Sequence, residues 1–468
     1  MASTLTTSWA ASSHPFRCLV DSAGDADDAD DANGKGALMA ITGRFVLLAV
    51  AGLVPLLLFP AWSTVLFVAI GLLLFLTLDL VLAASPAKLG LARQQPGNVT
   101  LESQVDSVLT VTNLGRRKLR AMIRDGWQPS AGALNPAQPL DVPAGERRRM
   151  TVSLAPRRRG DLESPHVTIR SYGPLRLAAR QRTRALPGRL RVLPPFHSKR
   201  HLPSKLRKLR ELDGRAAVQI RGAGTEFDSL RDYVRGDDVR SIDWRATARR
   251  TSVVVRTWRP ERDRRVVIVL DTSRTAAARI DDEPRLDTWI EAALLLAVLA
   301  ERGGDRVDFL AYDRMLRARV ESASKGNLLA QLVQAMATLE AELIELDWQQ
   351  IPGQVRAVSA HRSLVVLLTA LDGGAPEEGL LPMVAQLVRQ HVVVVASVRD
   401  PLLAEMKTGR STASQVFRAA AAERALLERA AVTEQLRQLG AEVVDAEPSE
   451  VPPLLADTYI RLKAAGRL

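Results

Sequence analysis

The residues of this chain best suited to binding an ion are Asp271, Ser273 and Thr275, which directly follow a short apolar run. That run, Arg265 to Leu270, is rich in β-branched residues, as is typical of a buried parallel strand. In a doubly wound sheet, ligands bind outside the carboxyl ends of the strands. A carboxylate and two hydroxyls at this spacing suit Mg²⁺ or Ca²⁺. The pattern therefore predicts either a divalent-cation site or a metal-free turn in which the aspartate caps a helix.

A second candidate segment lies upstream, between Arg221 and Arg256, and combines six acidic residues with eight arginines. Such balanced charge is unsuited to a phosphate-backbone groove, which needs a net positive surface. It favours a network in which arginines bind carboxylates, and either a structural clamp between domains or a docking surface for a partner is compatible with it. We expect the aromatic residues Phe227, Tyr233 and Trp244 to anchor the segment on the sheet. The candidate residues are Glu226, Arg231, Tyr233, Asp237, Asp238, Arg240, Asp243, Trp244 and Arg249.

No pattern of residues in the sequence indicates an active site. Arginines surround the pair Asp237 and Asp238 and would hold both carboxylates ionised, which is unsuited to acid–base catalysis. The six histidines are dispersed, and the sequence has no Gly-x-x-x-x-Gly-Lys-Ser/Thr loop for nucleotide phosphates. The single cysteine, Cys18, excludes an intramolecular disulfide and a cysteine-cluster metal site. We therefore expect a binding protein and not an enzyme.

The elements that must position Asp271 alternate between strand and helix from residue 261 onward. This alternation predicts an α/β domain over residues 261–468, built on a doubly wound parallel sheet. We expect strands at 265–270, 306–312, 363–368, 391–396 and 442–444, and helices at about 284–302, 326–342, 376–390, 412–439 and 451–464.

The region before this domain has a different pattern. Over residues 88–195, short runs in which apolar and polar residues alternate are separated by turn sequences such as Asn113-Leu114-Gly115. This spacing predicts a small β-sandwich-like domain. Residues 196–260 are expected to form a charged connector that contains the arginine-rich segment.

The N-terminal region indicates insertion into a membrane. Residues 1–38 are polar and acidic, so we expect either a disordered extension or translation that starts at Met39. Residues 45–78 carry no charge and would span about 51 Å as one helix at ~1.5 Å per residue, well beyond a ~30 Å hydrocarbon core. Pro55 and Pro60 divide the run, which predicts a transmembrane hairpin over 39–84 with helices at about 40–59 and 62–83. The alternative is a buried hairpin in a soluble protein.

Charge supports the membrane interpretation. Lysine and arginine flank the predicted hairpin and are absent from its loop, so we expect two spans of the plasma (inner) membrane with both termini cytoplasmic. The formal net charge of +12 is scattered along the chain and lacks the interleaved aromatic residues of a nucleic-acid stacking surface. A basic protein beside anionic lipid explains this excess, and no nucleic-acid binding is expected.

The arginine-rich segment carries a resemblance to a known family. It reads Arg221-Gly222-Ala223-Gly224-Thr225-Glu226-Phe227, then Leu230-Arg231-Asp232-Tyr233, then Gly236-Asp237-Asp238-Val239-Arg240-Ser241-Ile242-Asp243-Trp244, and Ala246-Thr247-Ala248-Arg249. It closely resembles the signature of the domain of unknown function family numbered fifty-eight, whose members carry it ahead of a von Willebrand factor A-like (vWA-like) domain. The resemblance covers most of the chain outside residues 1–38.

The resemblance implies a metal-ion-dependent adhesion site in a vWA-like Rossmannoid domain, because Asp271-x-Ser273-x-Thr275 is similar to its Asp-x-Ser-x-Ser motif. Such domains usually add a threonine from a later loop, where this chain offers only Ser322 or Ser324. They often add an aspartate after the fourth strand, where this chain has Ala370, with Asp372 two residues later. The candidate ligands for Mg²⁺ or another divalent cation are Asp271, Ser273, Thr275, Ser324 and Asp372.

The family resemblance also implies a function. Its members look like partners of MoxR-type AAA+ ATPases, so we expect a membrane-anchored adaptor in chaperone-like complex assembly or stress response, with the ATPase supplying the energy. Two alternatives stay open. One is a metal-dependent hydrolase that uses Asp271, for which the sequence shows no general base, and the other is a purely structural membrane protein that has lost its metal site.

Overall fold

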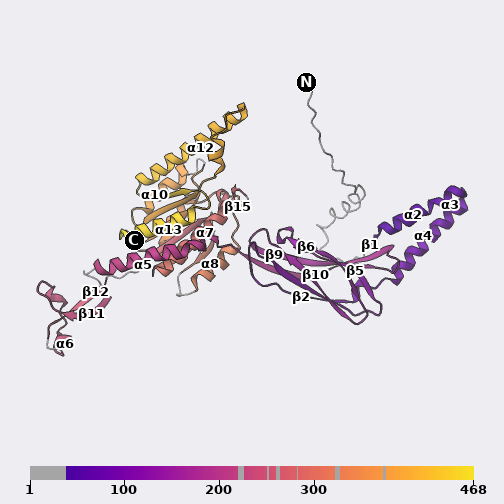
Figure 1. Ribbon diagram of the computed structural model, residues 1–468, viewed down its shortest axis with the longest axis horizontal. Coiled ribbons are helices and arrows are strands. Elements are labelled where there is room, and N and C mark those ends of the chain that lie inside the picture. The colour runs from indigo at the N-terminus through magenta and orange to yellow at the C-terminus, as the bar shows by residue number, and fades with distance from the viewer. Residues whose placement is uncertain are drawn as a thin grey trace, which may run out of the picture. The chain divides into compact units, whose positions relative to one another are not determined.

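The computed structural model of the 468-residue chain describes residues 38–219, 226–249, 252–259, 264–281, 283–321, 327–372 and 376–468. The described residues form two compact units (Figure 1). The first comprises the chain up to Pro96 together with Val105–Leu154 and Glu163–Arg189, and the second comprises Gly97–Gln104, Ala155–Leu162 and Leu190–Leu468.

The first unit is built on two sheets whose strands alternate buried and exposed side chains, because one face of each sheet packs in the core. One sheet has the order β2-β4-β8-β6, and the other has the order β1-β10-β9-β5-β7, with β3 paired to β10. The short strand β3, residues 160–162 of β9 and residues 190–193 of β10 are counted with the second unit. Residues 88–195 are therefore β-rich, as predicted. The strands are β1 Leu38–Ile41, β2 Leu89–Gln94, β3 Val99–Thr100, β4 Val105–Asn113, β5 Leu119–Asp125, β6 Ala133–Leu134, β7 Ala137–Val142, β8 Arg147–Leu154, β9 Gly160–Tyr172 and β10 Ala178–Leu193.

A buried ion pair joins the two sheets. Arg93 of β2 donates to both carboxylate oxygens of Asp125 of β5, at 2.8 and 2.6 Å. Trp127 Nε1 and Ser164 Oγ donate to the same carboxylate at 3.0 Å each, and the guanidinium lies over the Trp127 ring. Both charged side chains are excluded from solvent. A buried charge is tolerated only when its partners are in place, so this network fixes how the two sheets pack together.

Loss of one partner should therefore destabilise the first unit strongly. We expect Asp125→Ala to cost about 3–5 kcal/mol, because it leaves the Arg93 guanidinium buried without its carboxylate. Amide hydrogen exchange measured by mass spectrometry would show the loss as faster exchange in β4, β5 and β9. The control is Asp141→Ala, which removes the exposed 2.8 Å pair between Asp141 and Lys118 and should cost less than about 1 kcal/mol. Equal protection in Asp125→Ala and wild type would contradict the argument.

Three apolar helices precede β2: α2 Gly43–Ala51, α3 Leu53–Leu58 and α4 Trp62–Leu82. Among the described residues, the stretch Trp62–Lys88 is the only helix long and apolar enough to cross a membrane. The shorter apolar stretch Gly43–Leu58 falls below the length of a typical bilayer span. The structure thus supports one membrane-crossing helix, and the second predicted span stays a prediction.

The end of α4 is fastened to the β-sheets by Asp79. This side chain has no solvent exposure, and its carboxylate accepts hydrogen bonds from the backbone N–H groups of Leu175, Leu177 and Ala178 at 2.8, 2.8 and 3.1 Å. The turn approaches so closely that a Cβ on Gly173 would collide with this carboxylate, which explains glycine at that position. The last turns of α4 are therefore a continuous part of the first unit.

The second unit has a six-stranded sheet in the order β17-β16-β13-β18-β19-β20. All five predicted strands are present and parallel to one another. The sixth strand, β17, lies at the edge and is antiparallel to β16. The prediction missed β17, which follows β16 through a tight turn rather than a helical crossover. The strands are β13 Arg265–Asp271, β16 Arg306–Tyr312, β17 Leu316–Val320, β18 Leu364–Leu368, β19 Val392–Val398 and β20 Glu442–Ala446, with a small pair β14 Arg279–Ile280 and β15 Glu283–Pro284.

Helices cover both faces of this sheet. Alternate residues of β13 enter two separate cores: Val266 and Ile268 pack with α7, α8 and α13, whereas Val267 packs with α9, α10 and α12. This two-sided burial explains why β13 reads as a continuous apolar run. The helices are α5 Leu202–Gln219, α7 Arg285–Arg302, α8 Leu328–Ala337, α9 Ile351–Val358, α10 Leu381–Leu387, α11 Leu402–Met406, α12 Ala413–Gln438 and α13 Val451–Ala464.

Several predicted elements differ from the structure. The helix expected at about 40–59 is divided into α2 and α3, and residues 40–41 belong to β1. The helix expected at 326–342 ends at Ala337, because the chain beyond it bonds to the loop after β13: Glu342 N–H donates to Thr272 O at 2.8 Å, and Arg274 N–H to Ile344 O at 2.9 Å. The expected charged connector contains α5, whose Leu209 is buried in the same core as α7.

Candidate functional site

Asp271 is the last residue of β13 and lies where the order of the sheet reverses. The next strand in sequence, β16, pairs on one side of β13, and β18 pairs on the other. The connections from the two neighbouring strands therefore leave in opposite directions, which is the position at which open α/β sheets bind ligands. The structure thus places the predicted carboxylate where a site is expected.

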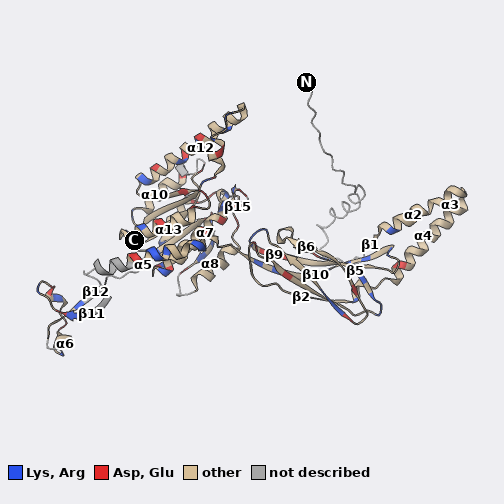
Figure 2. Ribbon diagram, viewed as in Figure 1, with Lys and Arg blue, Asp and Glu red and all other residues tan. Residues whose placement is uncertain are grey.

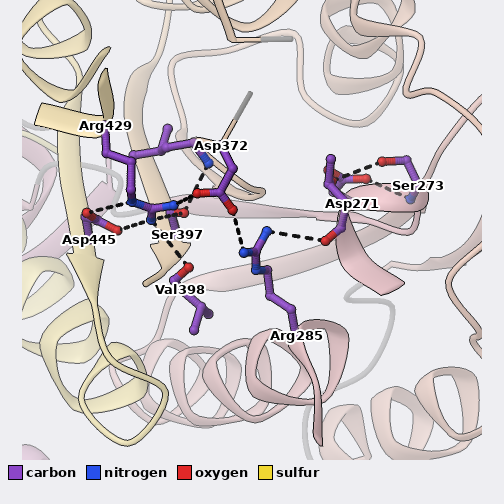
Figure 3. Close-up of polar contacts among 10 residues, drawn as sticks. Asp271, Ser273, Arg285, Asp372, Ser397, Val398, Arg429 and Asp445 are labelled. Atoms are coloured by element: carbon purple, nitrogen blue, oxygen red, sulfur yellow. Dashed lines mark hydrogen bonds and ion pairs between the residues drawn. The ribbon is translucent and has the colours of Figure 1, made fainter. Parts of the chain in front are cut away.

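Three hydroxyl-bearing residues surround the Asp271 carboxylate, which is 3% exposed (Figure 3). Ser273 donates its backbone N–H to Oδ1 at 2.8 Å, and its hydroxyl lies 3.2 Å from that of Thr275. The Thr275 hydroxyl donates to Oδ2 at 3.1 Å. Thr369, directly after β18, donates to the same oxygen at 2.7 Å. The structure thus brings Asp271, Ser273 and Thr275 together and adds Thr369, which the sequence analysis missed.

Asp271 differs from the other buried carboxylate at this edge of the sheet, Asp313. Burial raises the pKa of Asp313, but hydrogen bonds from Arg317 and nearby N–H groups outweigh it and leave the pKa below its ordinary value. Burial also raises the pKa of Asp271, and its donors, chiefly Ser273, Thr369 and Thr275, only partly oppose the rise. A buried carboxylate stabilised mainly by neutral hydroxyls is a candidate functional group.

Asp372 faces away from this hydroxyl set and toward two arginines (Figure 3). Arg285, the first residue of α7, donates to its Oδ2 at 2.5 Å, and Arg429 of α12 bonds to its Oδ1. Arg429 also bonds to Asp445 of β20 and, at 3.0 Å, to the Ser397 hydroxyl. The predicted ligand Asp372 is therefore part of an ion-pair network that ties α7, α12 and β20 to the edge of the sheet.

Arg285 lies between the two carboxylates, Asp271 and Asp372 (Figure 3). Its pKa is lowered to about 10, chiefly by burial and then by the neighbouring Arg429, whereas the charges of Asp400 and Asp271 favour the protonated form. Arg285 therefore stays a cation at neutral pH and supplies positive charge beside Asp271. It was not singled out in the sequence, where it is one arginine among many.

The residues around Asp271 fit a divalent cation in ligand type. The hydroxyls of Thr275 and Thr369 bond to the Asp271 carboxylate, and the Ser273 hydroxyl lies 3.2 Å from that of Thr275. Hard oxygen ligands of this kind are those that Mg²⁺ prefers. The set holds one formal negative charge. The described part of the chain contains no group of three or more His, Cys, Asp or Glu side chains placed to bind a metal. The predicted ligand Ser324 lies outside the described residues.

The arginine-rich segment forms a β-hairpin of β11 Glu226–Asp232 and β12 Val254–Arg259, with the short helix α6 Trp244–Thr247 between them. Two ion pairs stiffen it. Arg231 donates to Asp237 at 2.5 Å, and Arg256 donates at 2.8 Å to Asp243, which also caps α6 through the N–H groups of its first turn. The Arg231 hydrogen bond lowers the pKa of Asp237, and backbone N–H groups of α6 together with Arg256 lower that of Asp243.

Two aromatic residues of this hairpin, Tyr233 and Trp244, do not pack as anchors. Trp244 is 66% exposed, and Tyr233 is exposed as well. The prediction that they fix the segment on the sheet is therefore wrong for these two residues, and the side chains of Glu226 and Phe227 lie outside the described part of the structure. The same hairpin also exposes Val234, Arg235, Asp238, Val239, Arg240, Arg245 and Arg249.

The family comparison identifies the same region. The model of the family described as "Protein of unknown function DUF58" matches residues 229–438. The DUF58 match therefore includes most of the hairpin and the chain from β13 through α12. It covers both the Asp271 site at the sheet edge and the exposed Trp244 of the hairpin. This agrees with the resemblance that the arginine-rich segment predicted, but the match covers residues 229–438 and not most of the chain beyond residue 38.

Two curated mycobacterial proteins that match this chain are named as uncharacterized. A protein of Mycobacterium bovis and one of Mycobacterium tuberculosis are each 26% identical over 184 residues, which is 39% of this chain. The chain spans 57% of the length of these curated relatives. Among solved structures, a PapD-like domain of human CEP192 matches 22% of this chain and 84% of its own length at 8% identity, with a TM-score of 0.17. A β-glucosidase of Listeria innocua matches 22% of this chain and 16% of its own at 10% identity, with a TM-score of 0.14.

The ion-pair network should be essential to the stability of this edge of the sheet. We expect Arg429→Ala to cost about 1.5–3 kcal/mol, because it leaves the mostly buried carboxylate of Asp445 without its cation and leaves Asp372 with Arg285 alone. Urea unfolding of the detergent-solubilised chain, followed by exchange protection of β20, would measure the loss. Arg424→Ala, which removes an exposed pair with Glu428 on the same helix, is the control and should cost about 0.5 kcal/mol or less. Similar losses for the two variants would contradict a structural role of the network.

Proposed function

We propose that this chain is a membrane-anchored adaptor without enzymatic activity, and that its partner docks on the hairpin formed by residues 226–259. The observation that carries the proposal is the exposure of Trp244 on a hairpin that also exposes unpaired arginines. Trp, Tyr and Arg are the residue types that contribute most to protein–protein binding energy. Among the described residues, Arg235, Arg240, Arg245 and Arg249 form no ion pair within the chain.

The internal ion pairs of the hairpin support a docking role. Arg231 with Asp237 and Arg256 with Asp243 hold the turns that present Trp244, so little conformational freedom is lost when a partner binds. The same pairs also suit the alternative of a structural clamp. A clamp, however, would bury the aromatic side chains that the hairpin exposes, and the exposure of Trp244 therefore favours docking.

The partner that we propose is a MoxR-type AAA+ ATPase, for which the support is the resemblance to the DUF58 family. The adaptor would work in chaperone-like complex assembly or stress response, with the ATPase supplying the energy. We further propose that α2–α4 form a two-span hairpin in the plasma (inner) membrane with both termini cytoplasmic. For this, the support is the length of α4 and the distribution of Lys and Arg around the apolar helices.

We also propose that residues 261–468 form a vWA-like domain, which the strand order and the antiparallel edge strand support. Asp271, Ser273, Thr275 and Thr369 would hold Mg²⁺ or a similar cation, which supplies a coordination position for a carboxylate of the partner. A second candidate is a purely structural membrane protein whose site is metal-free. The observation that favours it is Arg285, a cation already beside Asp271.

The docking proposal predicts a loss of partner binding in a Trp244 variant. We expect Trp244→Ala to weaken binding of the MoxR-type ATPase encoded in the same genome by about 30-fold, the effect of removing a binding hot spot of ~2 kcal/mol. Biolayer interferometry with the full-length chain in detergent would measure it. Phe417→Ala is the control, because Phe417 is equally prominent on the exposed side of α12. Unchanged binding in Trp244→Ala, or the same loss in Phe417→Ala, would rule out the hairpin as the docking surface.

The metal proposal predicts opposite effects of two substitutions. Titration calorimetry of the full-length chain with Mg²⁺ and Mn²⁺ should show saturable binding that Asp271→Asn abolishes and Arg285→Gln strengthens, because the guanidinium repels the cation. Asp271→Asn should fold normally. Since the pKa of Asp271 is raised in the folded state, its ionised form costs stability at any pH above its unfolded value near 4, and the neutral amide removes that cost. If neither wild type nor Arg285→Gln binds Mg²⁺ or Mn²⁺, the metal proposal is wrong, and the structural membrane protein with a metal-free site is the remaining candidate.

A further inference from the structure

Two loops of the first unit, residues 114–118 and 173–176, contact the last turns of α4. The Arg117 guanidinium donates to the backbone carbonyl of Val81 in α4, and Leu114 N–H donates to Lys88 O at 3.0 Å, just beyond the helix. On the other side, the backbone N–H of Leu175 donates to the Asp79 carboxylate at 2.8 Å. These contacts place both loops directly beside the end of the apolar helix.

Both loops expose basic and apolar side chains together. Arg116, Arg117 and Lys118 are exposed in the first loop and Arg176 in the second, with Lys88 exposed beside the first. Leu114 is 68% exposed and Leu175 is 46% exposed. The Asp79 carboxylate, at the end of α4, is fully buried and accepts hydrogen bonds from backbone N–H groups of the second loop, so it adds no exposed negative charge. Lys118 pairs with the exposed Asp141 at 2.8 Å, so the net positive charge on the solvent-facing side of the two loops comes from Lys88, Arg116, Arg117 and Arg176.

The length of α4 sets the depth of this surface in a bilayer. Its 21 residues span about 31 Å at ~1.5 Å per residue, which matches a ~30 Å hydrocarbon core. Apart from Arg44 near the start of α2 and Asp79, helices α2–α4 carry no charge (Figure 2). With exposed Trp62 at one interface, Leu82 reaches the other interface. The loops that contact residues 79–88 then lie at the level of the lipid headgroups.

We propose that the loops 114–118 and 173–176, together with Lys88, form a binding surface for the headgroups of anionic phospholipids. Arg116 and Arg176 bind headgroup phosphates, and Leu114 and Leu175 insert at the boundary with the acyl chains. The surface is continuous with the apolar helix and complementary in charge to an anionic leaflet. The inference rests on the membrane placement of α4 proposed above. It assigns to the first unit a role in selecting the lipid environment, separate from partner docking.

The test uses the full-length protein in mild detergent, titrated with phosphatidylglycerol, phosphatidylcholine or inorganic phosphate, with bound lipid counted by native mass spectrometry. We expect wild type to bind phosphatidylglycerol at least about tenfold more tightly than phosphatidylcholine. Each basic residue near an anionic surface contributes about fivefold, so the double variant Arg116→Glu/Arg176→Glu should bind phosphatidylglycerol at least ~20-fold more weakly. The control, Arg147→Glu/Arg149→Glu, makes the same charge change on exposed positions of β8 and should bind as wild type does.

Equal affinity of wild type for the two lipids, or an equal loss in the β8 control, overturns the inference. Inorganic phosphate that competes at millimolar concentration also overturns it, because the surface would then bind a free anion. Unchanged thermal unfolding of both double variants in detergent shows that a loss of lipid binding is not a loss of folding. Carbonate extraction separates the two proposals: wild type released from membranes overturns the anchoring itself, whereas wild type that stays in the membrane but does not discriminate overturns only the lipid surface.

Discussion

The cost of burying a carboxylate shapes this chain at every level. Isolated charges are not tolerated inside proteins, so each buried aspartate needs donors that the fold must bring from elsewhere. Asp79 obtains three backbone N–H groups, Asp125 obtains Arg93, and Asp305 obtains Lys463 and Tyr459. In each case the donor comes from a different strand or helix. These carboxylates therefore connect elements that are far apart in sequence, and the apolar cores fill the space between them.

Asp271 is the exception among these carboxylates, and this makes it informative. Its side-chain donors are hydroxyls, which are weaker than the cations and paired amide groups that satisfy the others. The result is a carboxylate with a raised pKa at the point where the sheet order reverses. A purely structural aspartate in such a place would be better stabilised by a direct arginine pair, as Asp313 is by Arg317. The incomplete compensation is the physical reason to look for a function here.

The sequence predicted the sheet better than it predicted the site. Parallel strands such as β13 and β18 are recognisable because they are buried on both faces and read as unbroken apolar runs. The edge strand β17 was missed because Leu316-Arg317-Ala318-Arg319-Val320 is half exposed and short. Thr369 and Arg285 were missed for a different reason. Their roles depend on which strand and which helix end lie next to Asp271, and no local pattern contains that information.

For the hairpin, charge and aromatic content predicted the ion pairs but not the exposure of the aromatic side chains. Its ion pairs were predictable, because acids and arginines alternate at turn spacing and such pairs form locally, as Arg231 and Asp237 do. The direction in which Trp244 points was not predictable. An aromatic residue in a charged segment equally suits burial against the rest of the fold or presentation to a partner. Only the position of α6 in three dimensions distinguishes the two.

The two parts of the candidate site make different demands on a partner. Around the sheet edge, the carboxylates of Asp271, Asp372 and Asp445 face the guanidinium groups of Arg285 and Arg429, so most of the charge is already neutralised within the chain. A metal-bridged contact there must compete with Arg285 for Asp271. At the hairpin, Arg235, Arg240, Arg245 and Arg249 are exposed and, among the described residues, unpaired. A partner's carboxylates can reach these arginines without breaking any described ion pair of this chain. Association is favoured where the fewest existing contacts must be broken, so binding should begin at the hairpin. Contact at the Asp271 site can then only add to the affinity.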